Sequence, residues 1–74
     1  MTYYFMETMN PNSFCKAEAL KANTLTAAKR EASRKSCFYG TTLTIGTRLL
    51  DGSDGFVDPD SVVAVKSNGK WETV

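Results

Sequence analysis

This chain of 74 residues contains no histidine. It also contains only two cysteines, two prolines and one tryptophan. Without histidine, a serine or cysteine nucleophile lacks the general base that most often activates it. Two cysteines without histidine also cannot complete a four-ligand zinc site. We therefore expect a protein that is not an enzyme and that holds no metal and no cofactor.

Long hydrophobic runs are missing as well. No stretch of about 18 apolar residues occurs, so no transmembrane helix is expected. The first ten residues lack the positive region and the small-residue cleavage site of a secretory signal. Cys15 and Cys37 are accordingly expected to be reduced thiols of a cytoplasmic protein. The net charge is only +1, so any electrostatic argument must rest on local clustering of charge.

The most informative stretch that is present runs from residue 24 to residue 45. Thr24 can cap a helix, because its hydroxyl can accept from an early helical N–H. Behind it, Leu25, Ala28 and Ala32 form a narrow apolar stripe of mostly small residues, which lets a helix lie close to a sheet. Gly40 ends the helical run and admits a positive φ. A helix to about residue 35 and then a strand are predicted.

The remaining strands follow from alternation and from turn signals. Asn68-Gly69 is a strong signal for a two-residue hairpin, since both central positions of a type I′ turn need positive φ. Residues 14–22 are predicted as a strand, although 16–22 would suit a helix in isolation. The order is ββαβββ, one helix on one sheet with a thin core. The predicted strands are 3–8, 14–22, 41–49, 61–66 and 70–74.

Between the third and fourth strands lies the acidic segment 51–60. Its four aspartates raise the question of calcium, but an EF-hand loop needs ligands at alternate positions and a glycine at the sixth. Counted from Asp51, the fifth position is Gly55 and the sixth is Phe56. The pattern fails, and we expect a solvated acidic loop.

Two clusters of cations remain as candidates for binding. The predicted helix carries Lys29, Arg30, Arg34 and Lys35, and Lys66 and Lys70 lie on either side of the Asn68-Gly69 turn. A cationic face beside aromatic residues suits nucleic acid, or a partner that itself binds phosphates. The alternative is that both clusters are ordinary solvated surface, because most helices have one charged side.

Residues 20–71, and most densely 24–41, also carry a more specific pattern. It resembles the ninth-numbered family of type I-F anti-CRISPR proteins, which are small phage-encoded inhibitors of the RNA-guided CRISPR surveillance complex. The residues that carry the resemblance are Thr24-Leu25-Thr26, Ala28-Lys29-Arg30, Ala32-Ser33-Arg34, Cys37-Phe38, Gly40-Thr41, Ala64, Lys66, Gly69-Lys70 and Trp71.

The resemblance implies an α+β fold with a single helix on a five-stranded antiparallel sheet. It also implies binding to the backbone subunits along the guide RNA in the host bacterial cytoplasm. Such binding blocks pairing with target DNA and promotes non-specific binding of double-stranded DNA by the complex. The implied residues are Lys29, Arg30, Arg34, Ser36 and Phe38 for partner binding and Lys66 and Lys70 for DNA.

The chain departs from this family at two places. Ser36 stands where the family has a glutamine, and a hydroxyl cannot reach as far. The segment 51–60 is longer and more acidic than the tight turn of the family. A second hypothesis therefore stays open: a small phage protein that binds nucleic acid on its own, without a surveillance complex.

Overall fold

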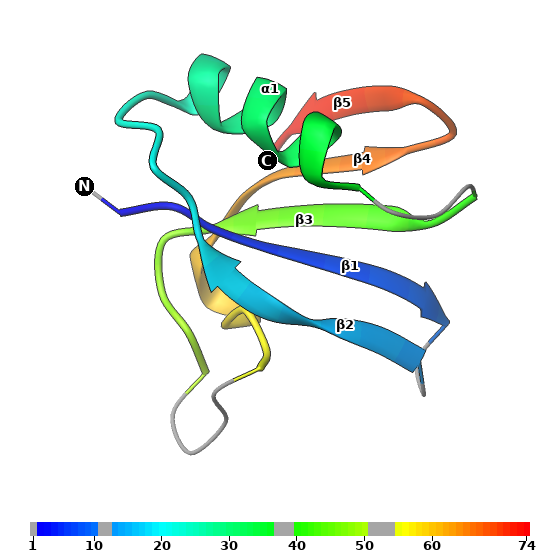
Figure 1. The fold of residues 1–74 in the computed structure, drawn as a ribbon. Helices are drawn as coiled ribbons and strands as arrows, with labels where there is room; N and C mark the ends of the chain where they lie inside the picture. Colours follow the sequence, from blue (N-terminus) through cyan, green and yellow to red (C-terminus); the bar gives the residue numbers. More distant parts are fainter. Residues whose placement is uncertain (1, 11–12, 37–39, 51–54) are drawn as a thin grey trace.

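The computed structural model describes residues 2–10, 13–36, 40–50 and 55–74, and they form one helix and one five-stranded sheet (Figure 1). All neighbouring strands are antiparallel, in the order β2-β1-β3-β4-β5. The predicted α+β fold and its ββαβββ order are confirmed. The elements are β1 (Tyr4–Asn10), β2 (Ser13–Ala19), α1 (Leu25–Lys35), β3 (Thr42–Gly46), the short 3-10 helix η1 (Pro59–Ser61), β4 (Val62–Ser67) and β5 (Lys70–Thr73).

Helix α1 begins and ends where its sequence predicts. The hydroxyl of Thr24 accepts a hydrogen bond from the backbone N–H of Ala27 at 3.2 Å, so the predicted N-cap is confirmed. Ala28 and Ala32 are fully buried against the sheet. Their small side chains let the helix backbone approach the strands closely. At the other end, the backbone N–H of Ser36 donates to the carbonyl of Ala32.

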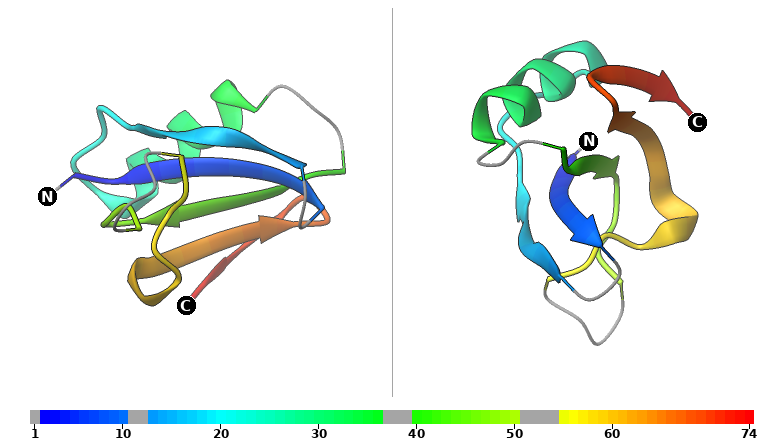
Figure 2. Two further views of the ribbon diagram at one scale, coloured as in Figure 1. Left: turned by 90° about the horizontal axis from the view of Figure 1, so that it is seen from below. Right: turned by 90° about the vertical axis from the view of Figure 1, so that its right-hand side faces the viewer.

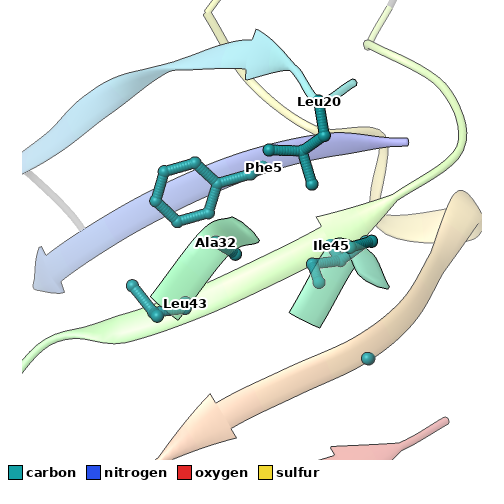
Figure 3. Packing of buried hydrophobic residues seen from close by; sticks show 7 residues of the cluster. Phe5, Leu20, Ala32, Leu43 and Ile45 are labelled. Carbon is teal, nitrogen blue, oxygen red and sulfur yellow. The ribbon is translucent and has the colours of Figure 1, made fainter. Parts of the chain in front are cut away.

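The main core lies between α1 and one face of the sheet. Phe5 of β1 and Leu43 and Ile45 of β3 point toward the helix, as Figure 3 shows together with Leu20 and Ala32. Side chains alternate between the two faces of a strand, so residues at every second position of β1 and β3 supply this layer. Tyr3, Ala22, Leu25, Val63 and Trp71 pack around its rim.

The predicted turn residues have the backbone geometry that their sequence requires. Asn68 and Gly69 have φ angles of 54° and 78°, the positive pair of a type I′ turn. This turn pairs Ser67 with Lys70 and Lys66 with Trp71, and so fixes the register of the β4–β5 hairpin. Gly40 also has a positive φ, 72°.

Two of the predicted strands are too long. The second ends at Ala19 rather than at residue 22, because the carboxylate of Glu31 on α1 accepts the backbone N–H groups of Lys21 and Ala22. These donors therefore bind the helix instead of a neighbouring strand. The third ends at Gly46 rather than at residue 49, since the N–H of Thr47 donates to the carbonyl of Ser61.

The chain after β3 folds back on itself beneath the sheet. Leu49 forms a β-bridge with Val57, and the N–H of Leu50 donates to the carbonyl of Phe56. Residues 55–61 then pass on the side of the sheet opposite α1 (Figure 2). Val57 is 1% exposed there, close to Gly46. The prediction of a merely solvated loop is wrong for this part, because Val57 is buried on this side of the sheet, as is Met6 of β1. We call these two residues and their surroundings the second core.

Candidate functional site

A shallow groove runs between α1 and the β4–β5 hairpin, and it joins the two cationic clusters that the sequence presents separately. Figure 1 shows α1 lying beside β4 and β5. Four of the nine lysines and arginines of the chain line the groove, and no carboxylate does. Its lining residues are Thr26, Lys29, Arg30, Ser33 and Arg34 from α1, and Lys66, Gly69 and Trp71 from the hairpin.

Helical periodicity explains the α1 wall of the groove. Residues three and four apart lie on the same side of a helix, so Lys29, Ser33, Arg30 and Arg34 form one surface. Ala28 and Ala32 occupy the buried side. Arg30 and Arg34 are exposed, whereas Lys29 and Ser33 are half-buried.

Strand pairing explains the other wall. Lys66 lies directly opposite Trp71 on β5 and opposite Leu43 on β3. Directly opposed residues share one face of a sheet. Leu43 belongs to the core beneath α1, so Lys66 and Trp71 also lie on the helix side.

Ser33 joins the two walls. Lys66 Nζ and Trp71 Nε1 each donate to Ser33 Oγ at 3.2 Å. Lys66 Nζ also lies 5.9 Å from the centroid of the Trp71 ring, within the range of a cation–π interaction. At the far end of the hairpin, Lys29 Nζ donates to Thr73 Oγ1 at 3.1 Å.

The nearby acidic side chains face away from the groove. Glu31 binds the backbone of residues 21 and 22, on another side of α1. Glu18 of β2 lies 3.6 Å from Lys35, and Lys35 does not line the groove. Among the described residues, Arg30 and Arg34 form no ion pair. The groove therefore concentrates positive charge even though the whole chain is nearly neutral.

The described part of the acidic segment also lies away from the groove, on the opposite side of the sheet (Figure 1). Arg48 Nε donates to Asp58 Oδ2 at 2.7 Å, and the N–H of Asp60 donates to Asp58 Oδ1 at 3.0 Å. The Asp60 N–H and the Arg48 guanidinium hold the pKa of Asp58 below its ordinary value. Asp58 is therefore a structural ion-pair partner. Asp51 and Asp54 lie outside the described residues.

Some of the predicted site residues line the groove and others do not. It brings Lys29, Arg30, Arg34 and Lys66 together in the groove. Lys70 is exposed on the hairpin and does not line it. Phe38 lies outside the described residues.

Ser36 has a partner inside the molecule. Its hydroxyl donates to Glu7 Oε2 at 2.9 Å, and the Thr41 hydroxyl donates to the same oxygen at 2.6 Å. Glu7 is only 3% exposed. The Ser36 side chain therefore ties the end of α1 to β1.

Ser33 and Trp71 line the groove but were not among the predicted site residues. Trp71 packs against the core, and it also lines the groove. The position of Trp71 beside Lys66 could have been predicted from the Asn68-Gly69 turn, because a two-residue loop places Lys66 opposite Trp71. The partners of Ser33 could not be found in this way, since they lie 33 and 38 residues away.

Other chemistry finds no support in the described part of the chain. No group of three or more acidic, cysteine or histidine side chains there could hold a metal ion. The side chains of Cys15 and Cys37 are not among those described. No helix in the same part combines the length and apolar composition needed to cross a bilayer.

Comparison with known proteins adds no relative to this picture. No protein-family model matches the chain, and a search of curated proteins finds no match.

Proposed function

We propose that this chain is a phage-encoded anti-CRISPR inhibitor that acts in the host bacterial cytoplasm. In this proposal it binds the backbone subunits of a type I CRISPR surveillance complex through the groove between α1 and the β4–β5 hairpin. Bound there, it blocks hybridisation of target DNA to the guide RNA. It acts by binding alone, without catalysis and without a cofactor.

One observation carries the proposal: four cations from two separate sequence clusters line a single groove that has no acidic residue. Positive charges that gather on one face create a local positive potential, which attracts anionic partners. A protein assembly that holds a guide RNA along its length offers phosphates and the residues that position them. The partner itself is named by the sequence resemblance. Of the basic residues that the resemblance implies, Lys29, Arg30, Arg34 and Lys66 line this groove, whereas Lys70 does not.

The residues take distinct roles in this proposal. Lys29, Arg30 and Arg34 orient the inhibitor on the backbone subunit, and Phe38 supplies an apolar anchor. Lys66 and Lys70 contact double-stranded DNA that the inhibited complex retains without sequence preference. Ser36 stands where the family contacts the partner through a glutamine.

The test replaces two positive side chains of the groove with negative ones while the fold is kept. In the variant Arg30→Glu/Arg34→Glu, both changes are at exposed positions, so the free energy of unfolding should change by about 0.5 kcal/mol or less. Binding to a purified surveillance complex should be lost, because like charges facing each other at an interface cost several kcal/mol.

A matched control places the same charge change elsewhere. Lys16→Glu/Lys21→Glu has the same net charge as the test variant, and both of its positions are exposed and lie outside the groove. The control should bind the complex as wild type does. Equal binding by the control and the groove variant would show that the cations of α1 are only solvated surface.

Binding of nucleic acid by the isolated protein is the second candidate, and the half-buried ring of Trp71 among cations favours it, since bases stack on such rings. Fluorescence of Trp71, the single tryptophan, reports on this directly. With a net charge of +1, we expect weak binding of DNA or RNA at physiological salt. Tight binding without the surveillance complex would favour this second function instead.

A further inference from the structure

We propose that Ser33 is a positioning residue that fixes Lys66 and Trp71 in the binding groove before any partner arrives. The inference rests on the proposed function, because it concerns the same groove. It adds a residue whose role is not evident from its type, a single serine in the middle of a helix.

The hydrogen-bond chemistry of the groove requires Ser33 to be the acceptor. A lysine ammonium and an indole N–H are donors only, so the Ser33 oxygen accepts from both Lys66 Nζ and Trp71 Nε1. A hydroxyl oxygen has two acceptor positions, and both are then engaged. The hydroxyl hydrogen of Ser33 remains to be donated, and no acceptor for it is present among the hydrogen bonds of the described residues.

The geometry around Lys66 shows what this arrangement achieves. A free lysine side chain samples many rotamers and loses conformational entropy when it is fixed. Here Ser33 holds the ammonium from one side, and the Trp71 ring lies 5.9 Å from it. Part of that entropy is therefore lost on folding rather than on binding, which favours association.

Lys70 provides the contrast on the same hairpin. It is exposed, and it does not line the groove. The two lysines flank the same turn, but only Lys66 has been placed by a partner on α1. We infer that Lys66 contributes to binding through Ser33, whereas Lys70 contributes as an unrestrained charge.

The first measurement needs no partner and uses the single tryptophan. The indole N–H of Trp71 gives one resonance in a proton–nitrogen NMR spectrum. In Ser33→Ala this resonance should shift and exchange faster with solvent, because its acceptor is removed. Ser33→Thr, which keeps the hydroxyl, should restore the wild-type behaviour, and Ser67→Ala, an exposed serine of the hairpin, should leave it unchanged. An unchanged resonance in Ser33→Ala overturns the inference.

The second measurement is the affinity of the inhibited surveillance complex for non-specific double-stranded DNA, which Lys66 contacts in the proposed function. Ser33→Ala should weaken binding about tenfold, the effect of losing one or two hydrogen bonds of ordinary strength. In a Lys66→Ala background the same substitution should weaken binding much less, because the lysine that Ser33 positions is gone. Equal loss in both backgrounds overturns the positioning role.

The two proposals fail in different ways. A wild-type protein that does not bind the complex refutes the proposed function, whatever the NMR result. A wild-type protein that binds the complex, with Ser33→Ala supporting equal retention of DNA, refutes the role of Ser33 alone.

Discussion

Gly46 at the end of β3 tests how the second core is built. The residue is buried, and a methyl group added to it would overlap with Cγ1 of Val57 and lie 2.8 Å from Oγ of Ser61. The backbone carbonyl of Ser61 would be 3.4 Å away. Gly46→Ala therefore places one methyl group where the structure has no space for it.

The size of the effect depends on whether these neighbours can move. Val57 is 1% exposed. Ser61 Oγ accepts from the N–H of Arg48 at 3.2 Å and lies 2.9 Å from the carbonyl of Asp58. Both neighbours are therefore held in place, and overpacking of this kind typically costs about 1–3 kcal/mol. For a domain of this size, each kcal/mol lowers Tm by roughly 4–8 °C.

The assay is thermal and urea unfolding of three variants: Gly46→Ala, Val57→Ala and the double substitution. Removing the Val57 methyl groups makes room for the added one, so the double variant should lose less stability than the two single variants together. The groove lies on the other side of the sheet, and binding to the surveillance complex should persist while the protein is folded. Wild-type stability of Gly46→Ala, or strict additivity, would refute this account of the second core.

Three further predictions follow from individual side chains. Glu7→Ala should lower the free energy of unfolding by about 2–4 kcal/mol, measured by urea unfolding, since the hydroxyls of Ser36 and Thr41 lose the buried acceptor that they share; a change comparable to that of an exposed substitution would contradict this role. The Asp60 N–H and the Arg48 guanidinium hold the pKa of Asp58 below its ordinary value in the folded protein, so its stabilising contribution is present above the unfolded pKa and is lost as pH falls through the folded pKa. The Tm difference between wild type and Asp58→Asn should therefore be constant near neutral pH and shrink in strong acid, and a difference that grows on acidification would refute it. Phe38→Ala should remain folded and lose about 2 kcal/mol or more of partner binding, and an unfolded variant would remove Phe38 from the site.

The groove and the second core occupy opposite sides of one sheet, and this separates function from stability in the molecule. Lys66, on the helix side of β4, helps form the groove. Residues 55–61, including the Arg48 partner Asp58, close the other side. Substitutions in the groove and substitutions in the second core can therefore be interpreted independently, provided that the variant is folded.

Features that depend on a few neighbouring residues were determined by the sequence alone. The Thr24 cap and the Asn68-Gly69 turn involve contacts over two or three positions, and both were predicted correctly. The buried stripe of Ala28 and Ala32 follows from helical periodicity in the same way. From these elements the fold class and the grouping of Lys29, Arg30 and Arg34 could be predicted.

The tertiary structure decided what depends on distant partners. Strand β4 brings Lys66 to Ser33, 33 residues away, and so merges two clusters that looked independent. Val57, a residue of the acidic segment, is buried beside Gly46. Glu7 is a buried acceptor for the hydroxyl of Ser36. These contacts cannot be predicted from neighbouring residues in the sequence, because whether a side chain is exposed or buried depends on the surface that the fold places opposite it.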